Sequence, residues 1–199
     1  WLGLDGRSTT ALLLEPECPE SFPAIVDPSW ITPASMSATD LEGDPVEEGL
    51  EALRVLGVAP EEIRSVLVTH EHADHVDRKL IERFQSARVF GPLESSIPKI
   101  EPFRSSFFEG LVQMIETPGH GGPHVSFVVD VEAMDLAVGF AGDLVMSQAH
   151  FLDLDHPLSF SDHEAGRQSI DVLRKALAET TRRHHVLVPG HDVPFFLID

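Results

Sequence analysis

The stretch Thr69-His70-Glu71-His72-Ala73-Asp74-His75 places three histidines and an aspartate within six residues. It directly follows Ser65-Val66-Leu67-Val68, an apolar run that predicts a buried β-strand. Neutral imidazole and carboxylate groups are common ligands of zinc and similar divalent metals. His70 and His72 are two positions apart, so both can point at one ion, while Asp74 and His75 can reach a second. The stretch therefore predicts a centre for two metal ions that needs further ligands from elsewhere.

Three further segments show an apolar run, a turn that contains glycine, and then a residue able to bind metal. Thr117-Pro118-Gly119-His120 follows residues 111–115, Gly142-Asp143 follows residues 136–141, and Pro189-Gly190-His191-Asp192 follows Val186-Leu187-Val188. Strand ends that lead into short turns are rigid, so they can bring together ligands that are distant in sequence. The agreement of four segments predicts that His120, Asp143 and His191 complete the centre.

With these residues the sequence resembles the metallo-β-lactamase superfamily over nearly the whole chain. The family's His-x-His-x-Asp-His motif corresponds to the stretch from His70 to His75. The resemblance implies seven metal ligands, which are His70, His72 and His120 for one ion, Asp74, His75 and His191 for the other, and Asp143 bridging the two. It also implies that Asp27 lies buried behind the ligands, and that the fold is a four-layer αββα sandwich.

The other histidines are expected to have different roles. His124 lies four residues after His120, and we expect it to brace the His120 turn by hydrogen bonding rather than to bind metal. Imidazole groups have many uses at surfaces and in hydrogen bonds. Such ordinary roles are expected for four further histidines, which are His150, His156, His184 and His185.

The rest of the pattern alternates strands and helices and indicates an α/β sandwich with mixed strands inside and helices outside. Strands are expected over residues 9–14, 22–27, 87–90, 111–116, 124–131, 135–141 and 186–188, of which the last is the final strand. Asp44-Pro45-Val46-Glu47 predicts a helix start, and Leu50, Leu53 and Leu56 follow at core spacing before Gly57. Further helices are expected over residues 77–84 and 162–179.

Composition favours a compact enzyme. The 199 residues suffice for a substantial core and show no boundary, so residues 1–199 are expected to form one domain. The formal net charge of −19 disfavours nucleic acid as a partner because polyanions would be repelled. No apolar run approaches the roughly 20 residues needed to span a bilayer. The single cysteine, Cys18, lies in a polar stretch that indicates a turn and favours a reducing cytoplasm. The oligomeric state, a homodimer included, stays open.

Two divalent metals beside a water predict hydrolysis. Such a pair lowers the pKa of water from about 16 toward about 7, so a metal-bridging hydroxide is available at neutral pH. Asp74 is the candidate to orient this water and accept its proton. A set of histidines and aspartates without thiolates suits zinc, and it also suits iron or manganese.

The segment over residues 146–166 leaves the strand that bears Asp143 and is the expected substrate-facing loop. In one interpretation His163 or Arg167 contacts a substrate oxygen, and a pocket wall is formed by Phe151, Leu152, Leu154 and Phe160. In the other, the segment is a solvated loop that ends in a helix cap at Ser161 or Asp162. An apolar pocket beside two metals suits a small ester, lactone or thioester. The alternatives are a phosphodiesterase or nuclease-type member of the family, and a mononuclear iron dioxygenase that acts on thiols such as persulfides.

Overall fold

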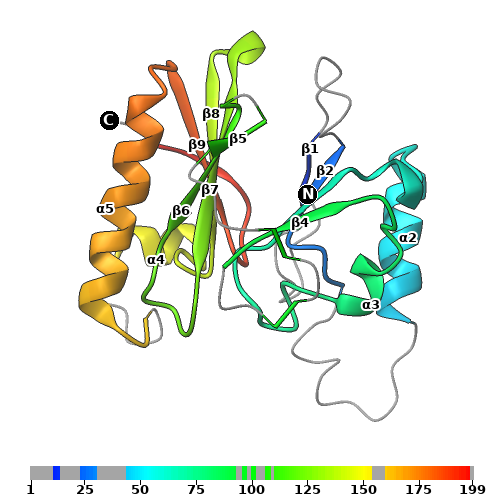
Figure 1. Cartoon of the computed structure of the whole chain (residues 1–199). Coiled ribbons are helices and arrows are strands. Elements are labelled where there is room, and N and C mark those ends of the chain that lie inside the picture. Colours follow the sequence, from blue (N-terminus) through cyan, green and yellow to red (C-terminus); the bar gives the residue numbers. More distant parts are fainter. Residues whose placement is uncertain are drawn as a thin grey trace.

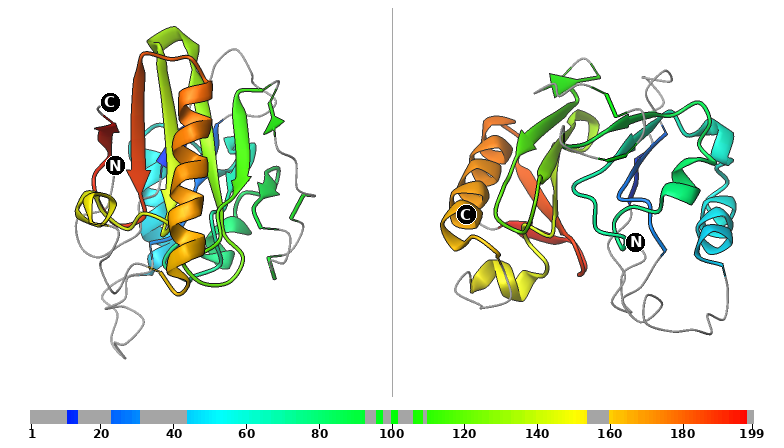
Figure 2. Two further views of the ribbon diagram at one scale, coloured as in Figure 1. Left: turned by 90° about the vertical axis from the view of Figure 1, so that its left-hand side faces the viewer. Right: turned by 60° about the horizontal axis from the view of Figure 1, so that its bottom comes forward.

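Two β-sheets face each other, and helices cover their outer faces (Figure 1). The computed structural model describes residues 11–13, 23–30, 44–92, 96–97, 100–101, 106–108, 110–153 and 160–197. The predictions for Cys18, Leu154 and His156 concern residues outside this part of the chain. The layers follow the predicted αββα order, with helices α2 and α3 on one side and helix α5 on the other (Figure 2).

The first sheet comes from the first half of the chain, in the order β1-β2-β3-β4. Its strands are β1 (Ala11–Leu13), β2 (Ala24–Val26), β3 (Ser65–Leu67) and β4 (Arg88–Phe90). β1 pairs antiparallel with β2, and the remaining pairs are parallel. Helices α2 (Pro45–Val55) and α3 (Arg78–Ile81) cover its outer face, and the short 3-10 helix η1 (Pro60–Glu62) precedes β3.

The second sheet has the order β10-β9-β8-β7-β6-β5. Its strands are β5 (Ser106–Phe107), β6 (Val112–Glu116), β7 (Val125–Val131), β8 (Leu136–Gly142), β9 (His184–Pro189) and β10 (Phe195–Leu197). Only the β8–β9 pair is parallel among these described strands. Helix α5 (His163–Glu179) covers the outer face, helix α4 (Gln148–Leu152) follows β8, and η2 (Glu132–Met134) links β7 to β8.

Successive side chains of a strand point to opposite faces of its sheet, and the buried apolar side chains form three layers. In β2, Ala24 and Val26 face the second sheet, whereas Ile25 packs with the helices α2 and α3. Between the sheets, Phe127 of β7 and Phe90 of β4 are completely buried. On the far side, Ile170, Leu173 and Leu177 of α5 are buried against β7, β8 and β9, as their helical spacing predicts. Both faces of both sheets are therefore covered, which explains why the strands are nearly continuous apolar runs.

Helix α2 begins and ends as the sequence predicts, but one of its leucines is placed differently. The Asp44 side chain accepts a hydrogen bond from the Val46 backbone N–H at 3.0 Å, and Gly57 follows the helix with φ of +75°. Val46 and Leu53 are buried, but Leu56 is 61% exposed, so its predicted core position is wrong. Leu56 is the C-cap residue, where the chain leaves the helix and the helical spacing no longer sets its direction.

Four short elements of the second half were not predicted, namely β5, η2, α4 and β10. The strand over residues 186–188 is part of β9, but it is not the last strand, because β10 pairs antiparallel with it at the edge of the sheet. Helix α4 lies inside the segment that was expected to be a loop. Within the described residues, no helix combines the length and apolar character that crossing a membrane requires.

Candidate metal centre

The seven predicted ligands lie together at one edge of the two sheets. Four follow β3 in the motif stretch, and the other three follow β6, β8 and β9. The structure groups His70, His72, His120 and Asp143 in one set and Asp74, His75 and His191 in another. His70, His75 and Asp143 are buried, whereas His72 is exposed. The centre therefore has a buried floor and a side that is open to solvent.

The first set brings imidazole nitrogens unusually close to one another. His72 Nδ1 lies 3.0 Å from His70 Nε2 and 3.1 Å from His120 Nε2. Asp143 Oδ2 lies 3.3 Å from His120 Nε2 and 3.9 Å from His70 Nε2. Four ligands placed tetrahedrally at zinc–nitrogen distances of about 2.0–2.1 Å are separated by about 3.3 Å. The spacing of this set fits one metal ion at its centre.

The second set has the same spacing. His75 Nε2 lies 3.4 Å from His191 Nε2, and His191 Nε2 lies 3.5 Å from Asp74 Oδ2. Asp143 Oδ1 lies 3.0 Å from His75 Nε2 and 3.2 Å from His191 Nε2. Asp143 Oδ2 also lies 3.4 Å from His191 Nε2, so the carboxylate lies between the two sets, where it could bridge two ions.

The Asp143 carboxylate also shows why a metal fits better than hydrogen bonds do. Among the described residues, its buried Oδ1 has no hydrogen-bond partner of suitable geometry, although two imidazole nitrogens lie within 3.2 Å. A buried acceptor without a partner costs about 1–3 kcal/mol. Ligands that converge on a common ion point at that ion rather than at each other, which explains this geometry.

Asp27 fixes which nitrogen of two histidines faces the centre. Its buried carboxylate accepts hydrogen bonds from the Thr69 N–H at 2.8 Å and the Thr69 hydroxyl at 2.7 Å. Its Oδ2 lies 3.0 Å from His75 Nδ1, and because a carboxylate only accepts, Nδ1 is the donor. His75 Nε2 is then free to bind metal.

The same network sets the tautomer of His70. The single hydroxyl proton of Thr69 is donated to Asp27, so the hydroxyl oxygen accepts from His70 Nδ1, 3.0 Å away. This places the lone pair of His70 on Nε2, the atom that faces the first set. One buried carboxylate thus prepares a ligand for each ion, which agrees with the role predicted for Asp27.

Contacts from neighbouring turns hold the motif stretch in place. The Ser29 hydroxyl donates to the Ala73 carbonyl at 2.7 Å, and the Asp77 N–H donates to the Pro28 carbonyl at 3.1 Å. Glu71 accepts hydrogen bonds from the backbone N–H of Ser96 and from its hydroxyl. The sequence did not identify Ser29 or Glu71 as supporting residues. Their only signal was position, directly after a strand and between two ligands.

The His120 turn rests on the start of helix α5. Gly119 has φ of +136°, and a β-carbon there would lie 2.5 Å from the backbone nitrogen of Gly166. Glycine is therefore required by both backbone conformation and close approach. The Ser169 hydroxyl donates to the Pro118 carbonyl at 2.7 Å, and the Asp162 N–H donates to the Gly119 carbonyl at 3.0 Å.

His124 packs behind the turn, as predicted. Its Nδ1 lies 2.9 Å from the Thr117 hydroxyl, and its ring is 5.1 Å from that of His70, centre to centre. It belongs to neither candidate ligand set. Burial, followed by the nearby His120, lowers the pKa of His124 to about 3, so the ring is neutral at physiological pH.

The histidines of the metal-free centre divide according to their pKa values. Burial lowers the pKa of His70 far below its usual range and also lowers the pKa of His120. Burial disfavours the charged form of His75 too, but the Asp143 and Asp27 carboxylates outweigh it and raise its pKa to about 10. Asp143 likewise raises the pKa of His191. Despite its burial, Asp143 is held well below its usual pKa by His191 and His75.

The predicted substrate-facing segment is only partly borne out. The Asp162 side chain caps helix α5 by accepting from the Ala165 N–H at 3.1 Å, as one interpretation expected. Phe160 is buried against Gly166 of the same helix. Phe151 and Leu152 line a different cavity, whose walls contain none of the seven predicted ligands, so their predicted place beside the metals is wrong. The formation of α4 carries both side chains to that cavity.

The histidines outside the metal centre contact neighbouring side chains or backbone groups. His150 is buried, and its Nδ1 accepts from the Met146 N–H at 3.1 Å. The His163 ring, at the start of α5, contacts Phe160 with ring centres 5.8 Å apart. His184 is exposed near Phe196. A contact of His163 or Arg167 with substrate stays a prediction.

Comparison with known proteins supports the motif and the fold. No model of a protein family matches the chain. Metallo-beta-lactamase domain-containing protein 1 of Xenopus laevis is 30% identical over 162 residues, which cover 75% of this chain and 62% of that protein. Hydroxyacylglutathione hydrolase of Albidiferax ferrireducens is 31% identical over 125 residues, covering 59% of this chain and 47% of that protein. The chain thus spans less than two thirds of the length of these relatives.

Solved structures show the same architecture at lower identity. A putative metallo-beta-lactamase from Thermotoga maritima matches with a TM-score of 0.65 and 23% identity, covering 96% of this chain and 89% of that one. An N-acyl homoserine lactone hydrolase with product at its catalytic metal centre matches with a TM-score of 0.66 and 20% identity, covering 92% and 80%. A protein solved in a di-iron-bound form matches with a TM-score of 0.63 and 22% identity, covering 98% and 93%. The chain therefore has the metallo-β-lactamase fold, and its sequence is similar to that of metallo-beta-lactamase domain-containing protein 1.

Proposed function

We propose that this chain is a hydrolase that uses two divalent metal ions to cleave a small ester, lactone or thioester. His70, His72 and His120 would hold one ion, Asp74, His75 and His191 the other, and Asp143 both. The observation that carries the proposal is the Asp143 carboxylate, which lies between the two sets, with Oδ2 3.3 Å from His120 Nε2 and Oδ1 3.0 Å from His75 Nε2. A centre for a single ion would need only one of these sets.

The open side of the centre favours catalysis over a structural role. Structural zinc sites are usually closed by four protein ligands and shielded from water. Here His72 is exposed, and Asp74, His120 and His191 are only partly buried. When bound, two divalent ions supply water of lowered pKa at neutral pH and polarise the carbonyl oxygen under attack.

The side chains assign the remaining roles. Asp74 has its Oδ2 3.5 Å from His191 Nε2 and reaches the solvent-facing side, so it can orient a water and accept its proton. Asp27 and Thr69 hold His70 and His75 with their Nε2 atoms toward the centre, so that no reorganisation is needed during turnover. No serine or cysteine nucleophile is required.

The choice of substrate class rests on charge and on relatives. The formal net charge of −19 opposes the approach of a nucleic acid. Relatives and structural neighbours include hydroxyacylglutathione hydrolases and N-acyl homoserine lactone hydrolases, whose names describe small acyl compounds. A carbonyl substrate is therefore proposed ahead of a phosphodiester.

A substrate panel tests the proposal. The metal-loaded protein is assayed with aliphatic lactones, acyl thioesters, aryl esters and bis-aryl phosphodiesters, alongside Asp74→Ala. We expect cleavage of at least one carbonyl class, and a loss of kcat of about 10²–10⁴-fold in Asp74→Ala with the fold retained. Asp77→Asn is the matched control, because Asp77 only caps helix α3. Unchanged turnover in Asp74→Ala would contradict the mechanism, and cleavage of phosphodiesters alone would favour the nuclease-type alternative.

Metal analysis tests the cofactor. We propose zinc, because the set is rich in histidine and aspartate, although a structural neighbour holds two iron ions. Plasma mass spectrometry of protein purified without added metal should give about two zinc per chain. About one iron per chain would instead support a mononuclear iron dioxygenase, which oxygen uptake with a persulfide substrate would then detect.

A further inference from the structure

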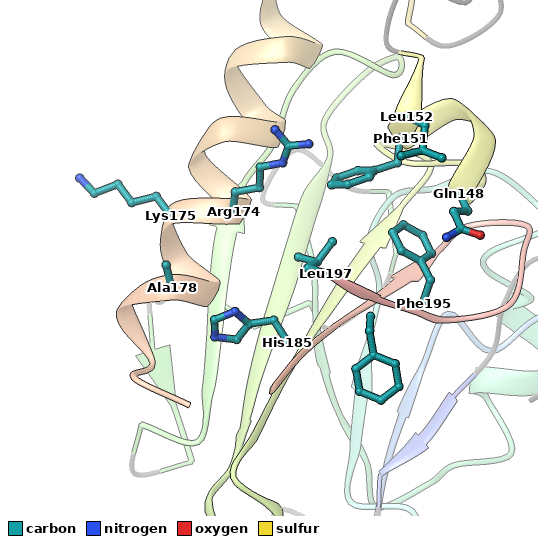
Figure 3. A pocket seen from close by; sticks show the side chains of 10 residues that line it. Gln148, Phe151, Leu152, Arg174, Lys175, Ala178, His185, Phe195 and Leu197 are labelled. Atoms are coloured by element: carbon teal, nitrogen blue, oxygen red, sulfur yellow. The ribbon is translucent and has the colours of Figure 1, made fainter. Parts of the chain in front are cut away.

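We propose that the chain has a second ligand site, away from the metal centre, that binds an organic anion with an apolar body. The site is a cavity of about 680 Å³ between helices α4 and α5 and the edge strand β10 (Figure 3). This volume is within the range of about 300–1,000 Å³ that is typical of pockets for small molecules. None of its lining residues belongs to either metal set or to the turns that support them.

The walls of the cavity are apolar and aromatic. Phe151 of α4 and Phe195 of β10 lie with their ring centres 5.3 Å apart, at an interplanar angle of 56°. Leu197 continues the wall along β10 (Figure 3). At the rim, Leu152 is 77% exposed and Phe196 is 64% exposed. Large apolar side chains that gather in one exposed hollow commonly mark a binding site.

The charged residues of the cavity are basic, in contrast to the rest of the chain. The sequence has 14 Lys and Arg against 33 Asp and Glu. The cavity is nevertheless lined by Arg174, Lys175 and His185, and no acidic residue that the structure describes lines it. The pocket is therefore a local site for an anion on a protein that otherwise repels anions.

Arg174 has donors available for a ligand, and His185 lines the cavity with its Nε2 buried. Arg174 lies over the Phe151 ring, with its guanidinium carbon 4.4 Å from the ring centre, and makes no ion pair with any residue that the structure describes. His185 Nε2 is buried and has no hydrogen-bond partner in the described part of the chain. Lys175 is 3.8 Å from Glu179, but both side chains are exposed, so this pair is weak.

The charge and shape together select the ligand. An acidic head group would be held by Arg174, while a hydrocarbon or aromatic body would lie on Phe151, Phe195 and Leu197. A cation would be repelled by the same rim. A neutral apolar compound would leave the basic groups unpaired, so it should bind less tightly.

Calorimetry on the metal-loaded full chain tests the site. The probe is octanesulfonate, because a sulfonate is a weak metal ligand and its alkyl chain matches the apolar wall. We expect saturable binding that weakens as salt is added. Arg174→Gln should weaken binding by up to about fivefold, the effect of one exposed charge contact. Ala178→Trp should abolish binding, because Ala178 lines the cavity from an exposed position of α5.

Matched controls separate this site from general effects. Arg54→Gln removes the same charge from α2 and should leave the affinity unchanged, since Arg54 pairs only with Glu51 among the described residues. Equal weakening by Arg54→Gln, tighter binding of octyltrimethylammonium, or unchanged binding in Ala178→Trp would each overturn the proposal. A dimer that Ala178→Trp dissociates, with no binding of the sulfonate, would assign the cavity to a second copy and also overturn it. None of these outcomes depends on hydrolysis.

Discussion

Replacing Asp27 by asparagine should weaken metal binding and leave the stability of the metal-free fold almost unchanged. Among the described residues, the wild-type carboxylate accepts hydrogen bonds from the Thr69 N–H, the Thr69 hydroxyl and His75 Nδ1. An asparagine has the same shape but carries an NH₂ group in place of one oxygen. If its oxygen faces the Thr69 N–H, its NH₂ group faces His75 Nδ1, which must then become an acceptor. The His75 ring then loses its proton on Nδ1 and keeps the one on Nε2, the atom that faces the second metal set.

The size of the effect follows from one mismatched buried hydrogen bond. Restoring the metal-binding tautomer would leave a donor facing a donor, at a cost of about 1–3 kcal/mol. Since 1.4 kcal/mol is a factor of ten, affinity for the second ion should fall by about 5- to 150-fold. This range agrees with the loss of about 10–100-fold that is typical when a partner behind a metal ligand is removed. The free energy of unfolding of the metal-free protein should change little. Without a metal ion, His75 Nδ1 can become the acceptor of the NH₂ group, so no donor faces a donor.

Equilibrium dialysis against zinc buffers, followed by plasma mass spectrometry, measures both ions separately. We expect Asp27→Asn to lose the second equivalent at free zinc concentrations that saturate the wild type. The first equivalent should also bind less tightly, because the NH₂ group would face the Thr69 hydroxyl that orients His70. Asp77→Asn is the control, because Asp77 is also a buried carboxylate but accepts only from backbone N–H groups at the start of α3. The reasoning would be refuted if Asp27→Asn bound both ions with wild-type affinity, or if the control lost as much.

Three further predictions concern protons, packing and the core. Metal binding to the second set should release protons at neutral pH, because the raised pKa of His75, about 10, keeps it protonated before the ion binds. Metal binding to the first set should release no proton from His70, because the lowered pKa of His70 keeps it neutral. Calorimetry in buffers of different ionisation enthalpy measures the protons released as each ion binds. Gly190→Ala should reduce the metal content measured after dialysis, because its β-carbon would lie 2.0 Å from Asp143 Oδ1. Leu173→Ala should lower the free energy of unfolding by about 2–5 kcal/mol, whereas Val172→Ala should change it by less than about 0.5 kcal/mol in urea denaturation. Leu173 is buried beneath α5, and its neighbour Val172 is 47% exposed.

The metal centre could be predicted because its residues follow strands that the sequence marks clearly. Apolar runs that end in a glycine turn and a ligand are local patterns, and the sheets bring them to one edge. The supporting contacts could not be predicted in this way. Glu71 holds Ser96 across 25 positions of the chain, and Gly119 approaches Gly166 of a different element. Such contacts depend on how elements pack, which a local pattern does not record.

The same reason explains the errors in the fold. β10 has only three residues, a run too short to identify as a strand before its pairing with β9 is known. Helix α4 has five residues and depends on its Ser147 cap, since isolated helices of this length are not stable. Its formation removed Phe151 and Leu152 from the predicted pocket wall. Long, strongly periodic elements such as α5 were predicted within one residue at each end.

Because the ligands are divided between the two sheets, bound metal ions would help to hold the two halves of the chain together. The first half of the chain supplies His70, His72, Asp74 and His75, and the second half supplies His120, Asp143 and His191. Neither half holds a complete set for either ion. Metal uptake would therefore report the docking of one half onto the other, so two separately expressed halves should recover tight metal binding only when mixed.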